Sequence, residues 1–298
     1  MFGFPGTGRG PVLALAGALL LAGCVTTGAA PQPAPPAAAP TTPPPAMQWL
    51  YGSGEAGALS IQVFHAFRDH ALAAARSRPR DSVVLAQGAT PAAPRWVPCG
   101  DKPPAVVLDA DETVLLNLGY EYDEALTGRT HNRARRDRYE RTGVESVAPV
   151  PGAVTALRAL REAGITVVFN TNRMAANAAE TARSLDFAGL GPARLGETLF
   201  LADDRSGSGK DGRRALIADR FCVVAMAGDQ LGDFSDAFNA RDLTVSERRR
   251  LATSGDIAGL WGNGWFLLPN PVYGPGLRGT FDEVFPQDRR WTDVEGGE

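Results

Sequence analysis

The chain has 298 residues, and its 30 basic and 33 acidic side chains give a formal net charge of −3 at pH 7. Removal of an amino-terminal signal that contains Arg9 would leave 29 basic residues against 33 acidic ones, a net charge of −4. This composition argues against nucleic acid as a partner, because proteins that bind polyanions usually carry a basic excess. The roughly 250 residues after the leader suffice for one large α/β domain.

The amino terminus has the pattern of a secretory signal. Residues 1–23 hold one charged side chain, Arg9, and residues 12–22 form an apolar stretch too short to span a bilayer comfortably. The small residues before Cys24 resemble the processing site of bacterial lipoproteins, which implies that Cys24 becomes the lipidated first residue and the membrane anchor. By the same resemblance, Val25 favours the outer membrane and an extracytoplasmic location. An ordinary signal cleaved near an incidental cysteine is the alternative.

A linker follows the expected anchor. Residues 24–46 are mostly Pro, Ala and Thr after the cysteine, with eight prolines between Pro31 and Pro45. Such a segment behaves as an extended, semi-rigid polyproline spacer, so we expect it to hold a globular domain, residues 47–298, off a membrane surface. A ligand for a domain that binds P-x-x-P segments is the alternative. The sequence holds no second transmembrane candidate, so attachment would rest on lipid.

The elements of the globular domain are predicted from the apolar pattern. Apolar residues recur at four-residue spacing between residues 49 and 78, which predicts an amphipathic helix ending before Pro79. We expect buried strands at residues 105–109, 165–169, 198–202, 221–227 and 265–268, and helices at 151–164, 174–187, 210–220 and from Thr244 onward. This alternation indicates an α/β fold with a parallel sheet and helices on both faces.

Residues 114–148 interrupt this order after the first strand. They are polar, and we expect a small helical insertion over the end of that strand. Its six arginines are Arg129, Arg133, Arg135, Arg136, Arg138 and Arg141. The simplest interpretation is a solvated helix face. The alternative is that Arg133 or Arg136 meets an anionic substrate.

Reactive groups follow each of the first four predicted strands. These groups are Asp109 and Asp111, then Thr171, Asn172 and Arg173, then Lys210, and finally Asp229 and Asp233. The carboxyl ends of parallel strands open into one crevice, so we expect these side chains to converge. Asp109 and Asp111 are two residues apart, and two unpaired carboxylates so close would repel each other and raise one pKa. A divalent cation is the natural partner for such a pair.

The order of these groups resembles the haloacid dehalogenase (HAD) superfamily of phosphohydrolases. The longer strings at residues 109–117, 171–173, 228–236 and 268–274, together with residues 49–55, are similar to the class C bacterial acid phosphatases, which are lipoproteins. The resemblance spans residues 49 to 285. It implies a Rossmannoid parallel sheet with helices on both faces, a small helical cap insertion and an N-terminal helix. It also implies hydrolysis of small phosphomonoesters such as nucleoside 5′-monophosphates and aryl phosphates.

The resemblance further implies roles for the carboxylates. Asp109 would be the nucleophile that forms an aspartyl-phosphate, and Asp111 would protonate the leaving alcohol and then take the proton of the hydrolytic water. Mg²⁺ would be bound by the Asp109 carboxylate, the Asp111 backbone carbonyl and Asp229. Asp233 would support this set of ligands.

Substrate contacts are expected from the other strand ends. Thr171 would hold phosphoryl oxygens, and Lys210 would neutralise their charge. The further substrate-binding candidates are Asn172, Arg173, Tyr120 and Tyr273. The two tyrosines match family positions where a ring near the site can stack on a nucleobase or aryl leaving group, and each could equally be a core or rim residue. Leu116 and Pro275 depart from the family pattern, which leaves the substrate rim open.

Each assignment has a structural alternative. Asp109, Asp111 and Asp229 could instead mark turns. Three other residues could instead serve only as helix caps, namely Thr171, Asn172 and Asp233. Arg213 or Arg214 could replace Lys210 as the phosphate ligand. His65, His70 and His131 show no spacing typical of metal ligands, and the first two could simply face solvent from one helix.

The two remaining cysteines, Cys99 and Cys222, lie near the starts of two predicted strands. If those strands are parallel neighbours, a disulfide between them is geometrically feasible, and an exported protein would meet an oxidising compartment. Two buried free thiols are the alternative.

The sequence also leaves alternatives for function. One is a phosphotransferase that passes the same aspartyl-phosphate to an alcohol. The other is a lipoprotein that uses the crevice only to bind a ligand. The sequence leaves open whether the protein forms a homodimer.

Overall fold

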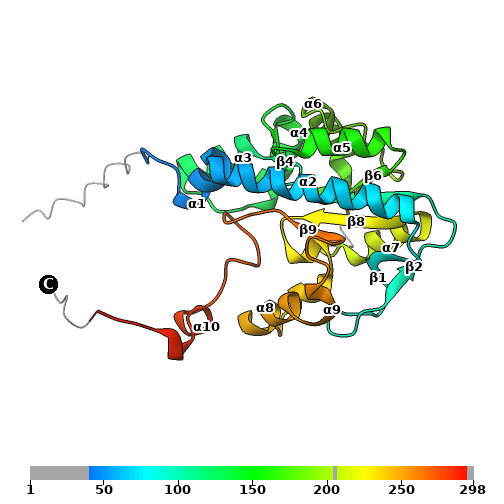
Figure 1. Cartoon of the computed structure of the whole chain (residues 1–298). Coiled ribbons are helices and arrows are strands. Elements are labelled where there is room, and N and C mark those ends of the chain that lie inside the picture. The colour runs from blue at the N-terminus through cyan, green and yellow to red at the C-terminus, as the bar shows by residue number, and fades with distance from the viewer. Residues whose placement is uncertain (1–39, 204–206, 294–298) are drawn as a thin grey trace, which may run out of the picture. The chain divides into compact units, whose positions relative to one another are not determined.

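Five parallel strands form the central sheet of the computed structural model, in the order β7-β6-β3-β8-β9. Figure 1 labels β6, β8 and β9 of this sheet. The strands are β3 (Pro104–Leu108), β6 (Thr166–Met174), β7 (Leu199–Ala202), β8 (Cys222–Gly228) and β9 (Trp265–Leu267). Each pairs in parallel with its neighbours. The five predicted strands are therefore present, and the expected α/β fold class is confirmed.

The structure describes residues 40–203 and 207–293. The predicted signal peptide, the lipidation site at Cys24 and nearly all of the predicted linker lie outside these residues. The described residues belong to one compact unit, which contains every feature below. Within the described ranges, none of the helices combines the length and the apolar character needed to cross a membrane.

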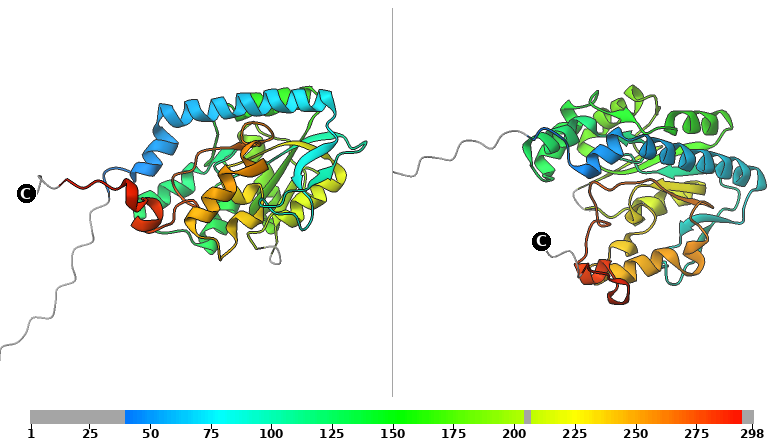
Figure 2. Two further views of the ribbon diagram at one scale, coloured as in Figure 1. Left: turned by 60° about the horizontal axis from the view of Figure 1, so that its bottom comes forward. Right: turned by 60° about the vertical axis from the view of Figure 1, so that its left-hand side comes forward.

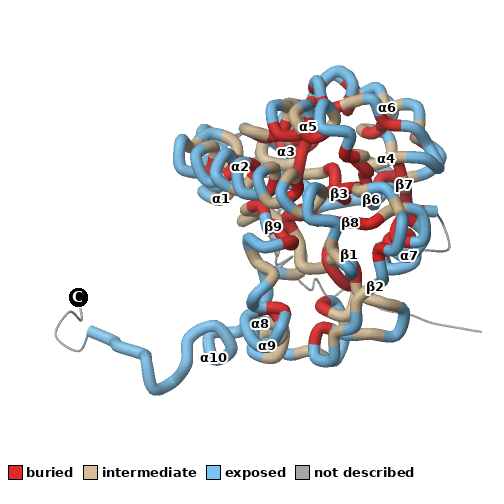
Figure 3. Tube along the Cα trace, turned by 45° about the vertical axis from the view of Figure 1, so that its right-hand side comes forward, coloured by how far each residue is buried: buried red, intermediate tan, exposed pale blue. Residues whose placement is uncertain are grey.

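The sheet separates two apolar cores. Along β3, Val106 and Leu108 belong to one core, while Ala105 and Val107 belong to the other, because successive side chains of a strand point to opposite faces. The helices that complete the first core are α2 (Gly54–Ser77), α5 (Ala153–Glu162) and α6 (Ala178–Phe187), and those of the second are α7 (Asp211–Arg220), α8 (Val245–Thr253) and α9 (Gly255–Ala258) (Figure 2). Burial is concentrated in β3, β6 and β8, which explains their apolar sequences (Figure 3).

The predicted first helix is broken near its start. A short α1 (Pro45–Met47) leads into a π-helical turn, η1 (Gln48–Gly52), and α2 begins only at Gly54. Ser53 separates the two, because its hydroxyl accepts a hydrogen bond from the Ala56 amide and donates one to the Trp49 carbonyl. The continuous helix expected from residue 49 is therefore wrong over its first turn, where a capping serine starts α2.

The polar insertion forms a small cap. Two short antiparallel strands, β4 (Leu115–Leu116) and β5 (Ala148–Pro149), close its base, and two helices, α3 (Leu118–Thr127) and α4 (Arg133–Thr142), form its body. The interpretation of a purely solvated arginine face is wrong for two of the six arginines. The side chains of Arg135 and Arg136 are only 12% and 13% exposed, because both pair with carboxylates. The other four are exposed.

Further elements were missed or displaced. Antiparallel β1 (Asp81–Leu85) and β2 (Trp96–Pro98) follow α2, and α10 (Phe281–Val284) and η5 (Gln287–Arg289) lie near the end of the described chain. Helix α5 starts at Ala153 after Gly152, whose φ of 91° is left-handed, rather than at residue 151. Helix α6 starts at Ala178, because β6 runs on to Met174 and η2 (Ala175–Asn177) intervenes. The capping box at Thr244 and Glu247 is present as predicted.

Cys99 and Cys222 form a disulfide, with their Cα atoms 4.6 Å apart. The bridge ties the segment after β2 to the first residue of β8. Asp229 follows the other end of β8, so the disulfide lies away from the strand ends that hold the reactive groups. The alternative of two free thiols is wrong.

Candidate active site

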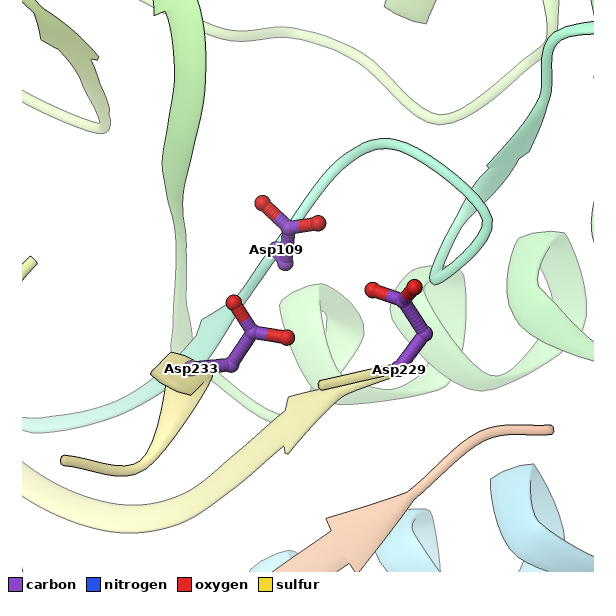
Figure 4. Close-up of side chains that lie close together, drawn as sticks. All are labelled: Asp109, Asp229 and Asp233. Carbon is purple, nitrogen blue, oxygen red and sulfur yellow. The ribbon is translucent and has the colours of Figure 1, made fainter. Parts of the chain in front are cut away.

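Three carboxylates converge at the carboxyl ends of neighbouring strands (Figure 4). Asp109 follows β3, Asp229 follows β8, and Asp233 ends the short turn η3 (Leu231–Asp233). One oxygen from each lies within 4.8 Å of the others, so the three could hold a metal ion. Asp109 and Asp229 are buried, with 8% and 7% exposure.

Lys210 lies against this cluster. Its ammonium donates to Asp109 Oδ1 and, at 2.7 Å, to Asp233 Oδ1. Its place just before α7 is fixed by Asp236, whose carboxylate accepts from the Lys210 amide at 2.8 Å. The lysine is buried, so these bonds are weakly screened by solvent.

The two arginines considered as alternatives to Lys210 have other partners. Arg213 donates to the side chains of Asn170 and Asn172, at 2.7 and 2.5 Å. Arg214 donates to the backbone carbonyls of Gly232 and Asp233, at 3.0 and 2.9 Å. Both arginines bind neighbouring segments around the site, whereas Lys210 contacts the carboxylates of Asp109 and Asp233 directly.

The cluster has more potential negative charges, from its aspartates, than the single positive charge of Lys210. Burial raises the pKa of Asp109 to about 7, and the charges of Asp233 and Asp111 add to this although Lys210 opposes it. Burial also raises the pKa of Asp229 well above its usual value, again with help from Asp233 and Asp109. A group of carboxylates that resists ionisation in this way is short of positive charge, which a cation would supply.

Asp111 has a different environment from Asp109. Its Oδ1 accepts from Arg173 Nε at 2.8 Å, from Arg136 at 2.7 Å and from the Asn117 amide at 3.0 Å. Burial alone would raise the pKa of Asp111, but Arg136 and Arg173 outweigh that effect and hold it well below its usual value. The two aspartates of the motif therefore lie in different electrostatic environments, because Asp111 contacts two guanidinium groups whereas Asp109 lies near other carboxylates and one lysine.

Glu112 and Asn117 are site residues that the sequence reasoning missed. Glu112 is 1% exposed and has a left-handed φ of 54°, which turns its side chain inward. Its carboxylate accepts from the Asn117 backbone at 2.9 Å, from the Tyr51 hydroxyl at 3.3 Å and from the Tyr273 hydroxyl. Glu112 thus connects the start of the cap to segments near both ends of the domain. The only sequence signal was its place inside the string 109–117.

Of the three candidate residues at the end of the second predicted strand, one lines the cavity and two are buried. Asn172 lines the cavity, while Thr171 is fully buried and its hydroxyl accepts from the Arg173 amide at 3.2 Å. Arg173 is also buried and pairs with Asp111 and Asn117, so it does not line the cavity as a substrate contact would. Neither Thr171 nor Asn172 caps α6, whose N-cap is Asn177.

A cavity of about 570 Å³ lies between the strand ends and the cap. The carboxylate cluster and Lys210 form its floor, and Tyr120 and Tyr273 both contribute to its walls. Pro275 lines it too, whereas Leu116 packs against the first core. The cap residues on the wall include Glu121, Glu124, His131, Arg133, Arg136 and Glu140. Both arginines considered as substrate contacts therefore face this space.

Comparison with known proteins identifies the family. The family model described as HAD superfamily, subfamily IIIB (Acid phosphatase) matches residues 69–276. The chain belongs to this acid phosphatase family. The proposed resemblance is confirmed, and the protein is a phosphomonoester hydrolase. A search of curated proteins gave no match.

Two solved structures support the assignment of the fold. The class C acid phosphatase from Bacillus anthracis is similar over 78% of this chain and 84% of its own, with a TM-score of 0.62 and 26% identity. A structure of the class C acid phosphatase from Bacillus anthracis with tungstate bound covers 84% of this chain and 90% of its own, with the same TM-score and 24% identity.

Proposed function

We propose that this acid phosphatase depends on Mg²⁺ and hydrolyses nucleoside 5′-monophosphates and aryl phosphates through an aspartyl-phosphate on Asp109. The observation behind this proposal is the convergence of Asp109, Asp229 and Asp233 with Lys210 on the floor of the cavity. A phosphoester dianion repels an anionic nucleophile, so such a site needs positive charge beside a placed carboxylate.

The three carboxylates suit a divalent cation. They are hard oxygen donors, as Mg²⁺ requires, and the raised pKa values of Asp109 and Asp229 indicate that Lys210 alone does not neutralise them. Bound there, Mg²⁺ would stabilise negative charge on the phosphoryl oxygens. Asp109, Asp229 and Asp233 are the side chains we assign to hold it.

The two aspartates of the first motif divide the chemistry. An oxygen of Asp109 attacks phosphorus as the bond to the leaving oxygen breaks, and Asp111 gives that oxygen a proton. In the second step water attacks phosphorus, Asp111 takes the proton of the water, and Asp109 is released. Arg136 and Arg173 favour the ionised form of Asp111, which the second step needs. A bound phosphoryl dianion would favour the protonated form needed in the first.

We further propose that Cys24 carries lipid and anchors the enzyme at the outer membrane, facing an extracytoplasmic space. The disulfide between Cys99 and Cys222 supports an oxidising location. Incorporation of labelled fatty acid into the chain, lost in Cys24→Ala, is the expected result. Label that persists in the variant would contradict lipidation at Cys24.

The decisive experiment measures phosphate release from p-nitrophenyl phosphate and 5′-AMP at mildly acidic pH, with Mg²⁺ or with EDTA. We expect turnover that needs the metal, is lost in Asp109→Asn and is kept in Asp101→Asn, because Asp101 is exposed away from the site. Equal turnover with EDTA would contradict the metal requirement. Transfer of phosphate to added glycerol in preference to water would favour the phosphotransferase.

A further inference from the structure

Glu121 is a buried carboxyl that the proposed mechanism does not use. It lies in the first turn of α3, is 3% exposed and lines the cavity. Within the described part of the chain, neither of its carboxyl oxygens has a hydrogen bond or ion pair, and Oε2 is shielded from solvent as well. A buried polar group without a partner destabilises a fold by about 1–3 kcal/mol, so its presence calls for a reason.

The other cap carboxylates on the cavity wall all have partners. Glu124 pairs with Arg135, and Asp137 pairs with Arg141. Glu140 accepts from the Asn177 amide at 2.8 Å and from the Met174 backbone at 3.1 Å. These bonds hold the cap together. Glu121 contributes to none of them, so its side chain is free to bond a molecule in the cavity.

The position of Glu121 relates it to the leaving group. The Asn117 side chain donates to Asp111, the proposed proton donor to the leaving oxygen. One helical turn later, the Glu121 amide donates to the Asn117 carbonyl at 3.1 Å. Asn117 therefore connects Glu121 to Asp111, and both carboxyl residues line the same cavity. An alcohol that takes its proton from Asp111 would leave into this cavity, whose wall also contains Glu121.

We propose that Glu121 forms a subsite for hydroxyl groups of the leaving alcohol, and that it selects sugar phosphates over aryl phosphates. The proposal rests on the proposed phosphatase function and names a specificity-determining residue within it. A substrate that forms a hydrogen bond to a buried, unpaired polar group is favoured in kcat/KM. An analogue that lacks the bonding group leaves the buried group unpaired and is disfavoured.

The surroundings favour a hydroxyl group over a cation. Burial raises the pKa of Glu121 to about 8, the charges of Glu112, Glu124 and Asp111 add to this, and Arg136 opposes it. At acidic pH the side chain is therefore a neutral carboxylic acid, which both donates and accepts a hydrogen bond. A hydroxyl group matches this pair of functions, whereas an ammonium group can only donate.

The test compares 5′-AMP with its 2′,3′-dideoxy analogue, using the full chain with Mg²⁺. We expect the wild type to show a kcat/KM about 10-fold higher for 5′-AMP, and Glu121→Leu to reduce this ratio to about 1. Glu121→Gln should keep most of the preference, because an amide also donates and accepts. Glu145→Leu is the matched control, since Glu145 is exposed on the same insertion. Phenyl phosphate should be hydrolysed equally by the wild type and Glu145→Leu, which provides the reference for phosphatase activity.

Three results would overturn the subsite. One is a ratio near 1 in the wild type with normal turnover of phenyl phosphate. Another is an unchanged ratio in Glu121→Leu. The third is a selective loss of O-phosphoethanolamine turnover in that variant, which would assign the carboxyl to a cation. Absence of phenyl phosphate turnover in the wild type would instead contradict the phosphatase function.

Thermal unfolding gives a second measurement. The thermal midpoint of Glu121→Leu should lie above that of the wild type, whereas it would lie below if Glu121 had a structural role.

Discussion

The Arg136 guanidinium donates to Asp111 Oδ1 at 2.7 Å, and this ion pair joins the cap to the loop that holds the proposed nucleophile. Both side chains are largely buried, at 13% and 18% exposure. The guanidinium also lies over the rings of Tyr120 and Tyr139, 5.1 and 5.4 Å from their centroids. The orientation of Asp111 therefore depends on how α4 packs, although Arg136 lies 25 residues later in the chain.

Arg136→Met should lower kcat/KM for p-nitrophenyl phosphate by about 10- to 100-fold, because Asp111 loses a charge-assisted bond and its only link to α4 among the described contacts. The control is Arg138→Met, which removes an exposed arginine from the same helix and should leave the rate unchanged. Steady-state kinetics on both variants checks this. Equal rates for the two would show that Asp111 does not need the cap.

The sequence was sufficient to predict the sheet and the floor of the site. Apolar runs such as residues 105–108 predict buried strands, and the end of a parallel strand places Asp109 and Asp229 in one crevice. These inferences need only the local pattern and the general geometry of parallel sheets. The fold family followed from the order of the motifs.

The ion pairs and hydrogen bonds in the walls of the site could not be predicted in the same way, although Tyr120 and Tyr273 were expected near the substrate and line the cavity. Arg136 looks like any solvated residue of a polar helix, because its pairing with Asp111 depends on how the cap packs. Glu112 should point away from Asp111 in an extended chain, and only its φ of 54° turns it toward Tyr273. Both cases depend on tertiary contacts that no local pattern encodes.

Glu112→Ala should lower the free energy of unfolding by about 3 kcal/mol. The backbone N–H of Asn117 and the hydroxyls of Tyr51 and Tyr273 would each lose a buried hydrogen-bond acceptor. Tyr273→Phe removes one of these bonds and should cost about 1 kcal/mol. Urea unfolding measures both. Glu162→Ala, on the exposed face of α5, is the control. A cost for Glu112→Ala no larger than for this control would contradict the network.

Removal of the disulfide should destabilise the fold. The bridge joins residues 123 positions apart, and a cross-link over so long a loop restricts the unfolded chain, which is worth about 2–4 kcal/mol. The double variant Cys99→Ala, Cys222→Ala should therefore unfold at lower urea concentration, and a reductant should shift the wild type toward the variant. The variant itself is the control, since the reductant should not affect it. A wild type that is insensitive to reductant during unfolding would contradict the bridge.

His70 should make stability depend on pH. The sequence left it as a solvent-facing residue of the first helix, but its ring is half-buried, with Nε2 at 3.2 Å from the Val224 carbonyl of β8 and its centroid 5.7 Å from that of Phe266. Burial lowers the pKa of His70, and the bond to Val224 opposes this only in part. The folded state therefore favours the neutral ring more than the unfolded state does.

The sign of the effect follows from proton uptake. An unfolded histidine titrates at about pH 6.5, so below that pH the unfolded state binds more protons at this position than the folded state. The contribution of His70 to stability is thus present above about pH 6.5 and is lost as the pH falls through the lower folded pKa. His70→Gln cannot be protonated. The thermal midpoint of the wild type should therefore fall more steeply than that of the variant from about pH 7 to pH 5. His65→Gln, exposed on the same helix, is the matched control, and parallel curves for wild type and His70→Gln would refute the assignment.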